Sequence, residues 1–121
     1  MGDRANIVFK QEGGSDIFLY THWEGSKLPA TLQSALKRGR PRWYDDSYLA
    51  RIVFCEMIGD DVKGETGFGI ATSPPDNEHD FLVVDCASQT VSRISEKKKS
   101  KGSWSFADYV ELDLAKKFAD Y

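Results

Sequence analysis

The order in which strand-like and helix-like hydrophobic patterns follow one another constrains this chain more than any single motif. Two short runs rich in β-branched and aromatic residues come first, at 4–10 and 16–23, and such runs are typical of β-strands. Apolar residues then recur at helical spacing in two successive segments, each followed by a glycine, Gly39 or Gly59, where a helix can end. The chain then returns to strand-like runs before a third helical stripe.

This order predicts about five strands and three helices. The strands are expected at 4–10, 16–23, 66–72, 81–86 and 90–95, and the helices at 28–38, 45–58 and 105–118. The predicted fold class is α+β in the order ββααβββα, with a mainly antiparallel sheet and the helices packed on one of its faces. Because 121 residues is the usual length of one domain, residues 1–121 are expected to form a single α+β domain.

Several positions within these elements can be predicted more closely. The run Phe81–Cys86 is apolar on both faces except at Asp85, which places it centrally in the sheet. The weaker run Thr90–Ser95 is expected at an edge of the sheet. Glu12–Ser15 has the composition of a turn between the first two strands, and Ser105 is expected to cap the last helix.

The formal net charge of −3 hides an uneven distribution. Half of the 16 basic residues lie in two short segments, Lys37–Arg42 and Lys97–Lys101, so the rest of the chain is distinctly acidic. We expect Glu96–Gly102 to form a solvated, mobile loop. The acidic balance argues against a nucleic-acid partner, since binders of nucleic acid usually carry a basic domain.

The sequence also bears on location and on metals. No apolar run approaches the roughly 20 residues that cross a membrane, so no membrane partner is expected. The N-terminal residues carry charge and no apolar leader, which predicts a cytoplasmic protein. The two cysteines, Cys55 and Cys86, lie in apolar stretches and are expected to be free and buried. Because zinc-site spacings and phosphate-loop motifs are both missing, we predict no metal and no cofactor.

Histidine is scarce, so imidazole chemistry has to use His22, at a strand end, or His79, on the loop before the central strand. A small hydrolase would pair one of them with a nearby carboxylate, Glu24 or Asp80, as acid–base groups. No nucleophile-elbow motif accompanies them. A solvent-exposed or hydrogen-bonded structural histidine is the alternative interpretation at both positions.

The segment Arg38–Trp43, followed by Tyr44, places cations next to aromatic side chains. Such a combination could hold a phosphate and stack a base. The alternative is an ordinary helix C-terminus, where basic residues complement the helix dipole and Trp43 anchors the following loop. Both interpretations stay open at this stage.

Four segments of the chain carry a family resemblance. They are Met1–Lys10, Ile17–Gly25, Tyr48–Met57 and Asp76–His79. Together they resemble a family of short bacterial and phage proteins of unknown function, with the pattern MGDRANI…YTHW…DNEH. The resemblance covers most of the chain and implies a bacterial or phage source. It implies no activity, so it transfers no role to any residue.

Polar and aromatic residues gather at the expected strand ends without a nucleophile–base motif. We therefore expect a small soluble non-enzymatic binding protein that holds a nucleotide-like or phosphorylated small ligand, or a protein partner, at the rim of its sheet. The candidate contacts are His22, Trp23, Glu24, Arg42, Trp43, Asn77 and His79. One alternative is the hydrolase described above. Another is a protein inhibitor of a host nucleic-acid enzyme, whose acidic surface would imitate phosphates.

Overall fold

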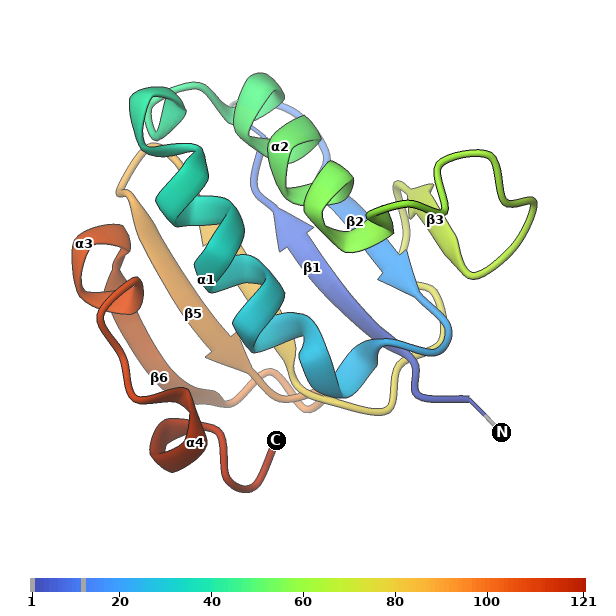
Figure 1. Cartoon of the computed structure of the whole chain (residues 1–121). Helices are drawn as coiled ribbons and strands as arrows, with labels where there is room; N and C mark the ends of the chain where they lie inside the picture. The colour runs from blue at the N-terminus through green and yellow to red at the C-terminus, as the bar shows by residue number, and fades with distance from the viewer. Residues whose placement is uncertain (1, 12) are drawn as a thin grey trace.

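The computed structural model, which describes residues 2–11 and 13–121, contains a six-stranded sheet (Figure 1). The strands lie side by side in the order β3-β2-β1-β4-β5-β6. Their bounds are β1 Ala5–Phe9, β2 Ile17–Thr21, β3 Phe68–Ala71, β4 Phe81–Asp85, β5 Thr90–Ile94 and β6 Ser100–Ser105. The α+β class is confirmed. The sheet is mixed, because β1 and β4 run parallel while every other neighbouring pair is antiparallel.

Two long helices cover one face of this sheet, and two single-turn helices follow β6 (Figure 1). Their bounds are α1 Leu28–Arg38, α2 Asp46–Ile58, α3 Phe106–Tyr109 and α4 Leu114–Lys117. The long helices agree with the prediction, and Gly39 and Gly59 follow their last turns. Asp45 caps α2, since its side chain accepts a hydrogen bond from the backbone N–H of Tyr48.

The N-terminal hairpin and the central strand form as the hydrophobic pattern predicts. Every residue of β1 is buried, and Val8 lies opposite Phe18 of β2 and Val83 of β4. A strand with a neighbour on each side and cover on both faces has to be apolar almost throughout. Of the turn predicted at Glu12–Ser15, Glu12 lies outside the described residues, and the chain turns at Gly13.

Two predictions about the part of the sheet that follows β4 are wrong. Thr90–Ser95 is not at an edge and Glu96–Gly102 is not all loop, because Ser100–Ser105 forms β6 and pairs with β5. A tight turn makes this pairing possible, since Lys98 adopts a φ of +63°. The serine and lysine side chains of β6 suit an edge strand, whose outer side faces water.

The prediction of a single helix over 105–118 is also wrong, because this segment forms two separate turns, α3 and α4. Ser105 caps α3 as predicted, by accepting a hydrogen bond from a backbone N–H three residues later. The chain leaves the helical path after Tyr109, and Asp113 caps a new turn in the same way. The apolar stripe still reaches the core, since Tyr109 and Phe118 are both buried.

The core lies between the sheet and the two long helices. Its main residues are Ile7, Phe9, Leu19, Leu82, Val84 and Val91 from the sheet and Leu32, Leu36, Leu49 and Val53 from the helices. Both cysteines are free, and Cys86 is buried as predicted. Cys55 is exposed, which contradicts the prediction, because α2 turns Leu49, Val53 and Met57 toward the core instead.

No helix within residues 2–11 and 13–121 is both long and apolar enough to cross a membrane.

Candidate functional site

The sheet divides the predicted contact residues between its two ends. Because β1 is antiparallel to β2 and parallel to β4, the end of β2 lies beside the starts of β1 and β4. Five of the residues belong to this first end of the sheet, namely His22, Trp23, Glu24, Asn77 and His79. Arg42 and Trp43 follow α1 at the opposite end, so the structure does not bring the seven residues together.

His79 lines a cavity at the first end of the sheet. Its Nε2 donates to Oδ1 of Asp3 at 2.6 Å, and its ring stacks on Tyr121 with 4.4 Å between ring centroids. The cavity has a volume of about 680 Å³. Its lining residues are Glu78, His79, Asp80, Ser95, Glu96, Lys97, Lys99, Lys101, Asp120 and Tyr121. We call it the His79 cavity.

Asp3 holds the imidazole in a fixed orientation. Besides the bond from His79, this carboxylate accepts a hydrogen bond from the backbone N–H of Ser26 at 2.9 Å. Partial burial on its own would raise the pKa of Asp3, but these hydrogen bonds outweigh it and lower the pKa below the ordinary value. The Asp3 side chain is therefore a carboxylate at neutral pH.

Arg93 is the most deeply buried charge of this region, at 3% exposure. Its Nε donates to Asp80 at 2.7 Å and its Nη1 to Asp120 at 2.9 Å. Its Nη2 is buried and has no hydrogen-bond partner among the described residues. Burial would lower the pKa of Arg93, but the hydrogen bonds that it donates to its two carboxylate partners raise it, so the guanidinium stays charged.

Tyr121 carries a second buried donor beside the same cavity. Its hydroxyl is shielded from water and has no hydrogen-bond partner among the residues that the structure describes. Burial raises the pKa of this phenol well above its ordinary value, so it keeps its proton. The Arg93 guanidinium lies 5.6 Å from the Tyr121 ring centroid. Arg93 is not among the residues that line the cavity, so only Tyr121 of these two belongs to its wall.

Lysines from the β5–β6 turn form another part of the wall. Lys101 lies 3.2 Å from Asp80, which already receives a bond from Arg93. Lys97 and Lys99 form no ion pair within residues 2–11 and 13–121. Their charges are thus available to an anion in the cavity.

The second histidine belongs to different surroundings. His22 Nδ1 shares a hydrogen bond of 2.8 Å with the Tyr20 hydroxyl. Trp23 is 53% exposed and lies against Gly67, whose φ of +99° and contact with the indole leave no room for a side chain. Trp23 and Glu24 line a separate cavity of about 350 Å³. The two histidines therefore do not line one cavity.

Arg42 and Trp43 have structural surroundings at the other end of the sheet. Trp43 is buried, and its Nε1 donates to the carbonyl oxygen of Leu36 at 2.9 Å. Arg42 lies over the Tyr48 ring and donates to the Tyr44 hydroxyl. This placement matches the loop-anchoring tryptophan considered as an alternative above.

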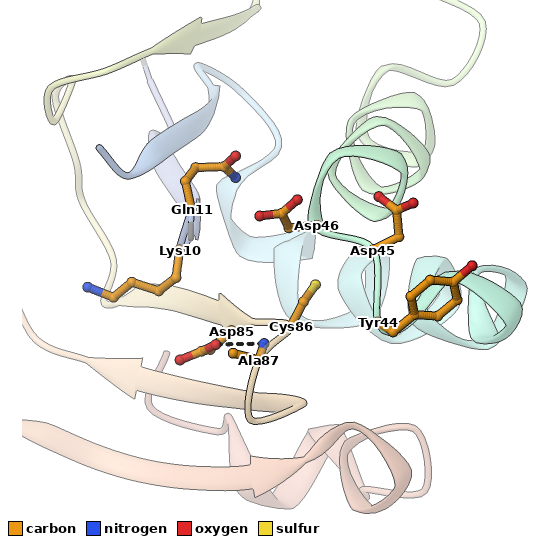
Figure 2. A pocket seen from close by; sticks show the side chains of 8 residues that line it. All are labelled: Lys10, Gln11, Tyr44, Asp45, Asp46, Asp85, Cys86 and Ala87. Carbon is orange, nitrogen blue, oxygen red and sulfur yellow. Dashed lines mark hydrogen bonds between the residues drawn. The ribbon is translucent and has the colours of Figure 1, made fainter. Parts of the chain in front are cut away.

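A smaller cavity of about 410 Å³ lies where the parallel strands β1 and β4 end (Figure 2). Its lining residues are Lys10, Gln11, Tyr44, Asp45, Asp46, Asp85, Cys86 and Ala87. In Figure 2 the Cys86 thiol points toward Asp46. Burial, together with the three nearby carboxylates, raises the pKa of this thiol to about 12. Asp45 and Asp85 already accept backbone hydrogen bonds.

The structure shows no metal-binding arrangement of three His, Cys, Asp or Glu side chains within the described part of the chain. Comparisons with protein-family models, with curated proteins and with solved structures return no match.

Three residues of the His79 cavity region were not predicted as contacts, namely Asp3, Arg93 and Tyr121. In the sequence, Arg93 stands out only as a charged residue two positions after Val91, on the same inward face of the predicted strand. Asp3 and Tyr121 carried no such signal, because each meets His79 only through the fold.

Proposed function

We propose that this protein is a small non-enzymatic binding protein that holds a phosphorylated or otherwise anionic small ligand in the His79 cavity. The observation that carries the proposal is the pair of lysines, Lys97 and Lys99, that line the cavity and form no ion pair within the described residues. An anion in the cavity would supply these two ammonium groups with a partner. The proposed bacterial or phage source rests on the family resemblance alone.

The charges around the cavity support an anion rather than a cation. Four carboxylates line the cavity. Asp80 and Asp120 are paired with Arg93, Asp80 also with Lys101, and Glu78 with Arg4, which leaves Glu96 as the one carboxylate without an ion pair among the described residues. Lys97 and Lys99 keep their charges free of ion pairs in the described part of the chain. Hydrogen bonds between cationic donors and phosphate oxygens are among the strong ones.

The cavity volume supports a small ligand. Small-molecule sites enclose roughly 300–1,000 Å³, and the His79 cavity has about 680 Å³. Tyr121 and His79 offer it a stacked aromatic pair, which can pack against an apolar part of the ligand. A nucleotide-like compound combines both features, a phosphate and a flat ring.

Calorimetric titration with inorganic phosphate, pyrophosphate and nucleoside monophosphates tests the proposal. We expect at least one of them to bind, and the double variant K97A/K99A to weaken its Kd by about tenfold or more, the contribution of one charge-assisted hydrogen bond. The matched control is K37A/K63A, which removes the same charge from exposed positions outside the cavity. Failure of all three probes, or equal weakening in both double variants, would refute the proposal.

One observation favours the hydrolase as a second candidate function. The carboxylate that holds His79 is Asp3 rather than the predicted Asp80 or Glu24, and a carboxylate-oriented histidine at a cavity wall can act as a general base. Assays with p-nitrophenyl phosphate and p-nitrophenyl acetate test this function. Turnover that H79Q abolishes while ligand binding persists would establish it, and no turnover by the native protein would end it. The inhibitor alternative stays a prediction from charge alone.

A further inference from the structure

The face of the sheet opposite the helices carries an apolar cavity that the proposed function does not use. Val8 lies opposite both Phe18 and Val83, and Phe81 lies opposite Ile94. These five side chains share one face, since their strand neighbours Ile7, Leu19, Leu82 and Val84 point into the core. They line a cavity of about 550 Å³.

The cavity is preformed by the loop between β3 and β4. Pro74 and Pro75 of this loop form one wall. The loop is tied to the sheet by Asn6, which is fully buried and donates from Nδ2 to the Asp76 carbonyl oxygen at 3.3 Å and to Asn77 Oδ1 at 3.2 Å. Because hydrogen bonds from a buried side chain hold the wall in place, a ligand would not have to order it.

The floor of the cavity suits a flat apolar group. Phe18 and Phe81 meet edge to face, with 6.2 Å between ring centroids and an interplanar angle of 71°. Val83 and Ile94 extend the floor as aliphatic side chains. All four are only partly buried, so a bound apolar group would remove further apolar surface from water.

The rim of the cavity is negatively charged. Three carboxylates, Asp16, Asp76 and Glu96, line it against one lysine, Lys98. Asp16 is paired with Lys10 at 3.2 Å. Asp76 and Glu96 form no ion pair within residues 2–11 and 13–121. The cavity therefore combines an apolar floor with two available carboxylates.

We infer that this cavity binds a small amphiphilic cation, with a flat apolar body on the Phe18–Phe81 floor and an ammonium group at Asp76 and Glu96. Its volume falls within the range of small-molecule sites, roughly 300–1,000 Å³, which favours a small ligand over a macromolecule. The charge preference is opposite to that of the His79 cavity. The two cavities are neighbours, since Ser95 and Glu96 line both, whereas Asn77 lines only this one and His79 only the other.

The test uses two fluorescent probes with the same apolar body and opposite charge, 1-naphthylmethylammonium and 1-naphthylacetate. We expect the ammonium probe to bind with a Kd at least about tenfold below that of the acetate probe, the effect of one favourable charge contact. The variant D76N/E96Q should remove this preference and keep the shared apolar binding. It changes only exposed side chains, so its fold is expected to persist.

A second pair of variants locates the probe. V83K places a charge on the floor and should abolish binding of the ammonium probe, whereas S103K places the same charge on the same face of β6, outside the cavity, and should leave binding unchanged. The inference is overturned if neither probe binds, if both bind equally, or if D76N/E96Q keeps the preference. It is also overturned if sedimentation shows a dimer that V83K dissociates, because a second copy would then cover this face.

Discussion

Replacing Arg93 with methionine tests the charge network that closes the first end of the sheet. Arg93 connects β5 to Asp80 before β4 and to Asp120 after α4, and it also donates to the carbonyl oxygen of Lys117 at 3.3 Å. Its guanidinium lies 5.1 Å from the Phe118 ring centroid. Methionine keeps much of the aliphatic volume, so R93M removes the charge and the hydrogen bonds while disturbing the packing little.

The expected loss of stability follows from the burial of each partner. Removing one partner of a buried ion pair costs about 3–5 kcal/mol, because the remaining charge is left in a poorly solvated position. Here Lys101 stays close to Asp80, and the Asp120 side chain is 73% exposed and can be hydrated. We therefore expect R93M to lower the free energy of unfolding by about 3 kcal/mol, the lower end of that range. For 121 residues this corresponds to a fall in Tm of about 12 °C.

Urea unfolding followed by tryptophan fluorescence and circular dichroism measures the effect. The control D120N removes the exposed partner alone and should cost much less stability than R93M, because water screens an exposed ion pair. The double variant D80N/R93M should be more stable than R93M, because it also removes the buried carboxylate that has lost its Arg93 partner. A loss below about 1 kcal/mol in R93M, or an equal loss in D120N, would show that the network does not stabilise the fold in this way.

Three further outcomes concern other buried groups. At pH 8 a thiol reagent should modify exposed Cys55 and spare Cys86, whose pKa is raised to about 12, until urea unfolds the chain; rapid native labelling of both would contradict this. The pKa of Asp3 is lower in the folded chain than its unfolded value of 3.8. It therefore stabilises the fold above pH 3.8, and this stability is lost as the pH falls through the folded pKa. The free energy of unfolding should therefore fall less below pH 3.8 in D3N than in the native chain, and equal falls would refute this role of Asp3. Trp43→Phe should lower the free energy of unfolding by about 1–3 kcal/mol, because it leaves the Leu36 carbonyl oxygen unpaired. It should not weaken anion binding, and weakened binding would place Trp43 in the site.

The candidate site was predictable only in part. His79 and Asn77 were found as polar residues before a central strand, and each lines a cavity there. Arg42 and Trp43 were grouped with them because charge and aromatic character are visible in sequence, whereas the end of the sheet on which a residue lies is not. The partner of His79 is Asp3, 76 residues away in the chain, so no local pattern could have indicated it.

The sequence by itself determined the first five strands and the two long helices. Hydrophobic spacing and end signals such as Asp45 and Gly59 act within a few residues, so they can be recognised locally. Tertiary structure alone decided that β4 joins β1 in parallel and that Ser100–Ser105 becomes an edge strand. It also decided that Arg93 is buried between two carboxylates. These outcomes depend on contacts between distant segments, whose free energy exists only once the sheet has formed.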